Sequence, residues 1–223
     1  CISMQNYDFY LFDLDGTLTD SAEGIFNSVS YALEKMQQPV PPREVLAQFL
    51  GPPLVQSFAQ FCGFSPEQSE EAVKLYRVYF TQHGMWENRV YPGVENVLQT
   101  LLHRGKRLAV ATSKPEQFAK QILAHFGLSD YFALIAGATM DNARSAKADV
   151  IRYALDALHA SPGQAVMVGD RRHDVQGAAA CGVDCVGVLY GYGSEEELRT
   201  AGAKYLAPTV QSLQTLLCGT EAK

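Results

Sequence analysis

The chain has 223 residues, of which 47% are hydrophobic, and a formal net charge of −6. This composition supports a buried core and excludes global disorder, and the length allows one large domain or two small ones. The acidic chain has no basic stripe, so a nucleic-acid polymer is not expected as a main partner. It also shows no signal peptide and no long apolar run, which favours a cytoplasmic protein without a membrane partner. Both a monomer and a dimer stay open.

The first structured element is a buried strand over Tyr7–Phe12, an apolar run that stops at two aspartates, Asp13 and Asp15. After it, strand character is lost as far as Gly84. Apolar residues then recur at helical spacing, and proline and serine mark helix starts. The expected helices are Ala22–Met36, Arg43–Leu50, Leu54–Cys62, and a fourth that begins after Ser65 and ends near His83. We interpret residues 19–84 as an inserted all-helical cap domain, and residues 1–18 and 85–223 as the core domain.

The remainder alternates between strands and helices. Strands are expected at Arg107–Ala111, Leu134–Ala136, Ala165–Val168 and Cys185–Leu189. Helices are expected at Val94–His103, Pro115–Phe126, Ala146–Leu158, His173–Cys181, Glu195–Ala201 and Val210–Leu217. Such alternation indicates βαβ units with right-handed crossovers. The sequence therefore predicts an α/β fold with a Rossmann-like sheet of five or six mostly parallel strands, in which Tyr7–Phe12 is central.

Ligands of open α/β sheets bind at the carboxyl ends of the strands, so the residues that follow each expected strand are informative. These residues are four acids, two hydroxyls and several cations: Asp13, Asp15, Thr112, Ser113, Lys114, Lys147, Asp170, Arg171 and Asp174. Two carboxylates at i and i+2 repel each other unless a cation, a shared proton or a catalytic role accounts for them. Such a set favours Mg²⁺ together with a phosphoryl group, because Mg²⁺ uses few carboxylates and keeps substrate oxygens as ligands.

Each of these residues also has a purely structural interpretation. Thr112 or Ser113 alone is more often a helix cap, and Lys147 alone is more often an exposed helix residue. Asp170 after a glycine is compatible with an ordinary turn. A structural account of each residue does not explain why all of them follow successive strands on one edge.

The same residues carry a resemblance to the haloacid dehalogenase superfamily, specifically to its phosphatases with a helical cap. Asp13-Leu14-Asp15-Gly16-Thr17 is similar to the nucleophile motif of that family. Thr112 matches the second motif, Lys147 the third, and Gly169-Asp170 with Asp174 the fourth, acidic motif. The resemblance covers nearly the whole chain.

This resemblance implies a mechanism. Asp13 would be the nucleophile and Asp15 the general acid and base. The implied Mg²⁺ site consists of Asp13, Asp15 (through its backbone carbonyl) and Asp170, while Asp174 orients metal waters or Lys147. Thr112, Ser113 and Lys147 would hold the phosphoryl oxygens.

Finer motifs resemble a bacterial subgroup that contains 5′-nucleotidases and phosphoglycolate phosphatases, among them Arg144-Ser145-Ala146-Lys147 and Gly169-Asp170-Arg171. Ala148 and Arg171 depart from the usual phosphoglycolate pattern, which favours a nucleoside monophosphate over phosphoglycolate. Lys114, Arg171 and the bend at Gly51 are the candidates for recognition of the leaving group. The expected substrate is a small phosphorylated metabolite. A sugar phosphomutase, and a phosphate-binding regulatory module without turnover, are the alternatives.

Overall fold

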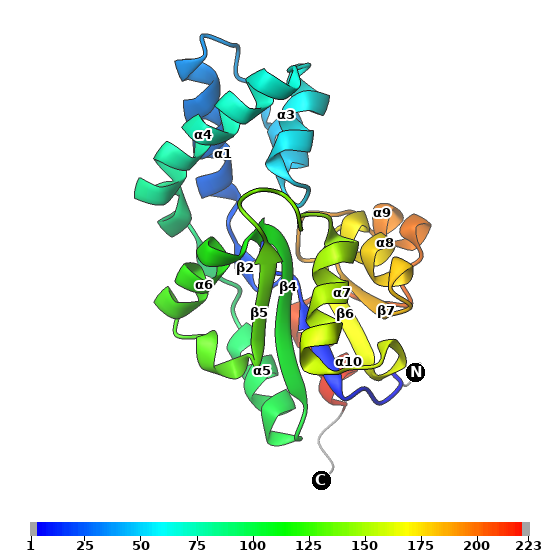
Figure 1. Cartoon of the computed structure of the whole chain (residues 1–223). Coiled ribbons are helices and arrows are strands. Elements are labelled where there is room, and N and C mark those ends of the chain that lie inside the picture. Colours follow the sequence, from blue (N-terminus) through cyan, green and yellow to red (C-terminus); the bar gives the residue numbers. More distant parts are fainter. Residues whose placement is uncertain (1–3, 220–223) are drawn as a thin grey trace.

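A six-stranded parallel sheet forms the centre of the computed structural model, which describes residues 4–219 (Figure 1). The strand order is β5-β4-β1-β6-β7-β8, and every neighbouring pair is parallel. The strands span Phe9–Phe12 (β1), Arg107–Pro115 (β4), Leu134–Ala138 (β5), Ala165–Gly169 (β6), Asp184–Val188 (β7) and Tyr205–Ala207 (β8). The α/β class and the internal position of the first strand are thus confirmed.

Alternating side chains of the strands build two separate hydrophobic cores. Tyr10 and Phe12 face one core, and Phe9 and Leu11 face the other, as the two-residue period of a strand requires. The first core is covered by α5 (Val94–His103), α6 (Glu116–His125) and α10 (Val210–Cys218), and the second by α7 (Lys147–Leu158), α8 (Arg172–Ala180) and α9 (Glu195–Ala201). Figure 1 shows the sheet between α6 and α7.

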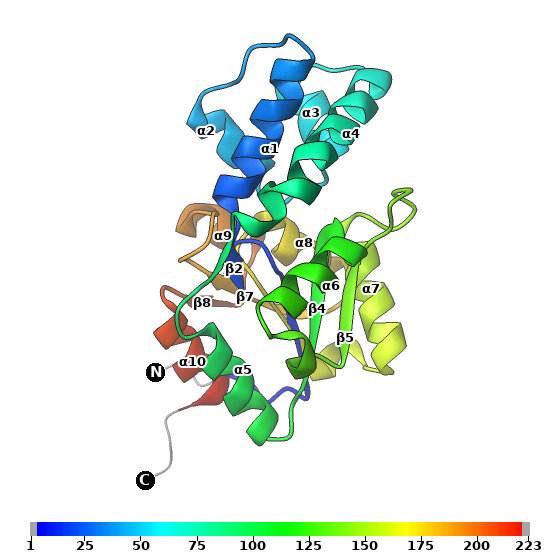
Figure 2. The same ribbon diagram turned by 90° about the vertical axis from the view of Figure 1, so that its left-hand side faces the viewer.

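Four helices form a separate layer above one end of the sheet in both views (Figures 1 and 2). They are α1 (Ala22–Lys35), α2 (Arg43–Leu46), α3 (Leu54–Cys62) and α4 (Pro66–Gln82), and we call residues 22–82 the insert. Helix α4 begins with a capping box between Ser65 and Gln68, which satisfies backbone donors of its first turn. The assignment of 19–84 as an independent domain stays a prediction.

The insert joins the rest of the chain through a small antiparallel ladder. Strand β2 (Thr19–Asp20) pairs with β3 (Arg89–Val90), and the Arg89 guanidinium lies 3.1 Å from the Asp20 carboxylate. The two connections therefore lie side by side.

Several boundaries differ from the expectation. The helix expected over Arg43–Leu50 ends at Leu46 and continues as a 3₁₀ turn over Ala47–Phe49. Other 3₁₀ turns span Gly84–Trp86, Ser129–Tyr131 and Pro162–Gln164. Strands β2, β3 and β8 were not predicted, because each has only two or three residues. No helix within residues 4–219 combines the length and the apolar character needed to cross a bilayer.

Candidate active site

Asp13 is the first residue after β1 and is buried, with 4% of its surface exposed. The backbone N–H of Leu14 donates to its Oδ1 at 2.8 Å, and Lys147 Nζ lies 3.0 Å from the same oxygen. Burial, and next the negative charge of Asp174, raise the pKa of the Asp13 carboxyl to about 7, although Lys147 acts in the opposite direction. A carboxylate in this setting is poised for a cation or an electrophile.

Lys147 begins α7 and reaches back across the sheet edge. Its ammonium lies 2.9 Å from Asp174 Oδ1 and donates to the carbonyl oxygen of Ala111 at 3.1 Å. A Cβ at Gly177 would come within 2.8 Å of the Lys147 side chain, so the glycine makes room for it. Burial lowers the pKa of Lys147, but the charges of Asp13 and Asp174 outweigh it, and the net shift is upward. Lys147 is therefore a fixed positive charge.

Asp170 and Asp174 follow β6. Asp174 Oδ2 accepts hydrogen bonds from the N–H groups of Asp170 and Arg171 at 3.0 and 3.1 Å. Asp170 accepts one from the N–H of Tyr192 at 2.8 Å. Burial, and then the charges of Asp174 and Asp13, raise the pKa of Asp170 well above its usual range.

These carboxylates fit a divalent cation. One oxygen of each of Asp13, Asp170 and Asp174 lies within 4.8 Å of the other two, and all three residues are buried. Lys147 is the cation that contacts two of them, and the raised pKa values of Asp13 and Asp170 reflect burial first and the repulsion between the carboxylates second. An all-oxygen set of this kind suits a hard cation such as Mg²⁺.

The expected metal ligands were Asp13, the backbone carbonyl oxygen of Asp15 and Asp170, with Asp174 beside them to orient metal waters or Lys147. The Asp174 carboxylate lies next to Asp13 and Asp170. The Asp15 carboxylate points elsewhere: it accepts a hydrogen bond from Ser21 Oγ at 2.7 Å and lies 3.4 Å from Lys114 Nζ. Asp15 also lines the cavity described below. Its side chain thus lies at the cavity, while its role in proton transfer and the role of its carbonyl oxygen stay predictions.

Thr112 and Ser113 lie near the end of β4, as expected from the sequence. Thr112 is buried, and its Oγ1 accepts a hydrogen bond from the N–H of Lys114 at 3.1 Å. This bond fixes the turn that carries Ser113 and Lys114, and both of these residues line the cavity. The predicted phosphate-binding roles of the two hydroxyls stay predictions.

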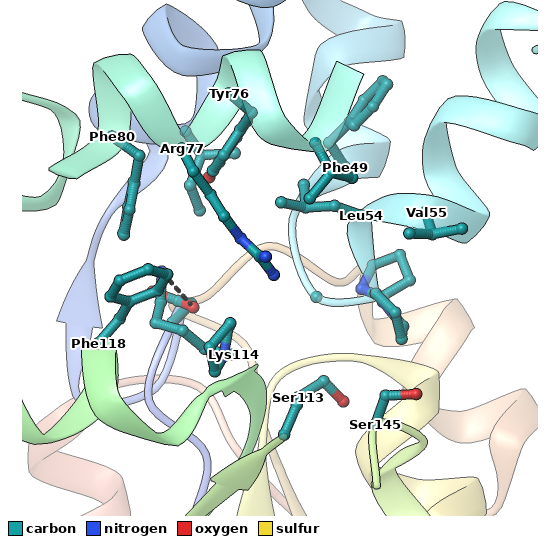
Figure 3. Close-up of a pocket in the computed structure, with 18 of the residues that line it drawn as sticks. Phe49, Leu54, Val55, Tyr76, Arg77, Phe80, Ser113, Lys114, Phe118 and Ser145 are labelled. Atoms are coloured by element: carbon teal, nitrogen blue, oxygen red, sulfur yellow. Dashed lines mark ion pairs between the residues drawn. The ribbon is translucent and has the colours of Figure 1, made fainter. Parts of the chain in front are cut away.

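A cavity lies between the insert and the carboxyl ends of the strands (Figure 3). From the core it is lined by Asp15, Ser113 and Lys114, and the Gly51 bend lines it from the insert. The remaining lining is mainly apolar or aromatic and includes Phe49, Leu54, Val55, Tyr76, Phe80 and Phe118. Arg77 of α4 also lines it, and no sequence argument had singled out this residue.

Arg171 does not line this cavity. Its Nε and Nη2 donate to the carboxylate of Glu197 at 2.9 and 3.2 Å, and its Nη1 donates to the carbonyl oxygen of Leu50. The Gly51 Cα faces the same side chain, because a Cβ there would lie 3.2 Å from Arg171 Cγ. Two of its donor atoms thus bind Glu197 within the core and one binds the insert, and recognition of the leaving group by Arg171 stays a prediction.

The parallel sheet, with acidic residues gathered at the carboxyl end of its first strand, defines an α/β enzyme with a cation-accepting site. A model of the haloacid dehalogenase-like hydrolase family matches residues 10–188, and the chain belongs to this family.

The chain is also similar to individual named proteins. A 5′-nucleotidase of Pseudomonas aeruginosa is 43% identical over 211 residues, which cover 95% of this chain and 96% of that protein. The tyrosine-protein kinase PtkA of Mycobacterium tuberculosis is 46% identical over 183 residues, 82% of this chain but only 62% of that protein. A predicted phosphatase from Clostridium acetobutylicum, known from a crystal structure, superposes with a TM-score of 0.92 at 48% identity and covers 95% of this chain and 98% of its own. The chain is a phosphatase of this family.

Proposed function

We propose that this protein is a Mg²⁺-dependent phosphomonoester hydrolase that acts on a small phosphorylated metabolite through an aspartyl-phosphate on Asp13. A nucleoside monophosphate is the first substrate candidate and phosphoglycolate the second. The observation that carries the proposal is the buried Asp13 carboxylate, held 3.0 Å from Lys147 beside two further aspartates.

In the first half-reaction, the free oxygen of Asp13 attacks phosphorus in line with the ester bond. The Leu14 N–H and the Lys147 ammonium hold the other oxygen, Oδ1. The same ammonium and the Thr112 hydroxyl stabilise charge on the phosphoryl oxygens as the transition state forms. Asp13, Asp170 and the backbone carbonyl oxygen of Asp15 would hold Mg²⁺, with Asp174 orienting Lys147 or metal waters, and the cation would supply further neutralisation of the phosphoryl charge.

Asp15 acts as the general acid and then as the general base. In its protonated form it donates to the leaving alkoxide, and as a carboxylate it later takes a proton from the water that attacks the aspartyl-phosphate. Ser21 and Lys114 hold its two oxygens, at 2.7 and 3.4 Å. These contacts keep the carboxyl group at the cavity, where the leaving group departs.

The nature of the cavity supports a leaving group with an apolar or planar body. Phe80 from the insert and Phe118 from the core line it and pack edge to face, with ring centroids 5.4 Å apart. Aromatic walls of this kind bind a nucleobase by stacking. The 43% identity to a protein named 5′-nucleotidase supports the same choice.

The test is turnover of a substrate panel by the purified protein with and without Mg²⁺. The panel contains nucleoside 5′-monophosphates, 2-phosphoglycolate, sugar phosphates and phenyl phosphate. Release of inorganic phosphate that requires Mg²⁺ supports the proposal, and no release from any ester contradicts it. A phosphomutase would instead convert a sugar phosphate to its isomer in the presence of the bisphosphate, which product analysis distinguishes.

A further inference from the structure

Arg77 lies in the middle of α4, and its side chain extends from the insert into the cavity. Figure 3 shows the guanidinium pointing away from α4 towards Lys114 and Ser113 of the core. On the same helix, Val73, Tyr76 and Phe80 also line the cavity. A charged group therefore lies in the part of the cavity wall that α4 contributes, which is otherwise mostly apolar.

One hydrogen-bond donor of the Arg77 guanidinium is shielded from water and is not satisfied by the described part of the protein. Its Nε is buried and has no hydrogen-bond partner within residues 4–219. Burial lowers the pKa of Arg77, which reflects the cost of keeping the charge there. An unsatisfied buried donor of a charged group is destabilising, and an acceptor supplied by a bound ligand would remove this cost.

The other charges of the cavity do not offset Arg77. Lys114 and Asp15 form an ion pair with each other at 3.4 Å, and Lys114 also lies over the Phe80 ring, 4.4 Å from its centroid. Among the described residues that line the cavity, Lys114 has an acidic partner and Arg77 has none. An oxygen acceptor is the natural complement of such a group.

On the basis of the proposed function, we propose that Arg77 determines substrate specificity by binding an acceptor oxygen at the far end of the leaving group. The phosphoryl group lies at Asp13 in the core, whereas Arg77 approaches from the insert across the cavity. The acceptor therefore belongs to the departing part of the substrate, either a carbonyl oxygen of a nucleobase or a carboxylate of a small acid. Such a bond, formed away from phosphorus, helps to hold the ester for attack.

The experiment compares three esters: UMP with a carbonyl-bearing base, 2-phosphoglycolate with a carboxylate, and phenyl phosphate with no acceptor beyond the ester oxygen. We expect Arg77→Met to lower kcat/KM about 10- to 100-fold more for UMP or 2-phosphoglycolate than for phenyl phosphate, the loss expected for a charged hydrogen bond. The substrate that shows the excess loss identifies the acceptor. Arg77→Lys keeps the charge and is expected to recover part of it.

Lys74→Ala is the matched control, since Lys74 is exposed on the same helix, and it should leave all three kcat/KM values at the wild-type level. Thermal unfolding provides a second measurement. Because Arg77 has an unsatisfied donor in the folded state, Arg77→Met should keep or raise the melting temperature. Equal losses of Arg77→Met on all three esters would overturn the proposal. Absence of hydrolysis of all three esters by the wild-type protein would instead contradict the proposed function.

Discussion

The guanidinium of Arg171, which follows β6 in the core, donates a hydrogen bond to the backbone carbonyl oxygen of Leu50 in the insert. The same guanidinium forms a two-pronged ion pair with Glu197 at the start of α9. Arg171 thus ties the segment that carries Asp170 and Asp174 to the Gly51 bend of the insert. Its position links the insert to the segment that carries the acidic cluster.

Arg171→Ala is expected to destabilise the protein by about 3 kcal/mol, because it leaves the half-buried Glu197 carboxylate without its main partner. Denaturant unfolding measures this change. The kcat/KM loss should be similar for UMP and phenyl phosphate, since Arg171 contacts Glu197 and Leu50 and does not line the cavity. A loss confined to UMP would support Arg171 as a specificity residue. Arg172→Ala is the control: Arg172 pairs with the same carboxylate at 2.7 Å but is 42% exposed, so its loss should be below about 1 kcal/mol.

The Glu197 pair also predicts a pH dependence of stability. Burial raises the pKa of Glu197, but hydrogen bonds and charge from Arg171 and Arg172 outweigh burial, and the net pKa lies below its ordinary value of 4.5. A depressed pKa contributes stability above the unfolded-state pKa, and this contribution is lost as pH falls through the folded-state pKa. The unfolding free energies of wild type and Glu197→Gln should therefore differ most near neutral pH and converge below pH 4.5. A gap that widens on acidification would contradict this pairing.

Much of this arrangement is local in the sequence and was predictable. The apolar run that ends at Asp13 identifies a buried strand, and strand–helix alternation places later strand ends on the same edge. The approach of Lys147 and Asp170 to Asp13 follows from that topology.

Other features depend on contacts distant in sequence. Arg171 and Leu50 are 121 positions apart. The sequence therefore indicated a charged residue at the carboxyl edge of the sheet but did not indicate which residue it contacts. Arg77 stands four residues after Val73, which is buried on α4, and this spacing places both on one helical face. The helical spacing was therefore visible in the sequence, but an arginine at the border of an apolar face usually buries only its aliphatic stem and keeps its guanidinium in water. Only the cavity in the structure shows that the guanidinium of Arg77 points inward instead.

Mg²⁺ is expected to raise the melting temperature of the wild-type protein, because a ligand bound to the folded state stabilises it by mass action. Asp170→Asn should reduce this shift strongly. In EDTA, however, the same variant should be at least as stable as wild type, since it removes a charge that Asp174 and Asp13 oppose. Differential scanning calorimetry in both conditions is the measurement. Asp149→Asn, at an exposed site, is the control and should respond to Mg²⁺ as wild type does. An undiminished shift in Asp170→Asn would exclude this cluster as the metal site.

Asp13→Asn is expected to lower turnover of phenyl phosphate by at least about a thousandfold, because an amide cannot form the acyl phosphate bond. The amide oxygen still accepts the Leu14 hydrogen bond, so circular dichroism and the melting temperature should show a folded protein. Fluoroberyllate, a mimic of the aspartyl-phosphate, should bind the wild-type protein in the presence of Mg²⁺ and fail to bind the variant.

Asp8→Asn serves as the control, because Asp8 is exposed next to the amino end of β1 and its loss should leave turnover intact. Intact mass spectrometry must show that the amide introduced by Asp13→Asn has not deamidated. If a verified Asp13→Asn protein turned over phenyl phosphate at the wild-type rate, the covalent route through Asp13 would be wrong, and a metal-activated water would have to be the nucleophile.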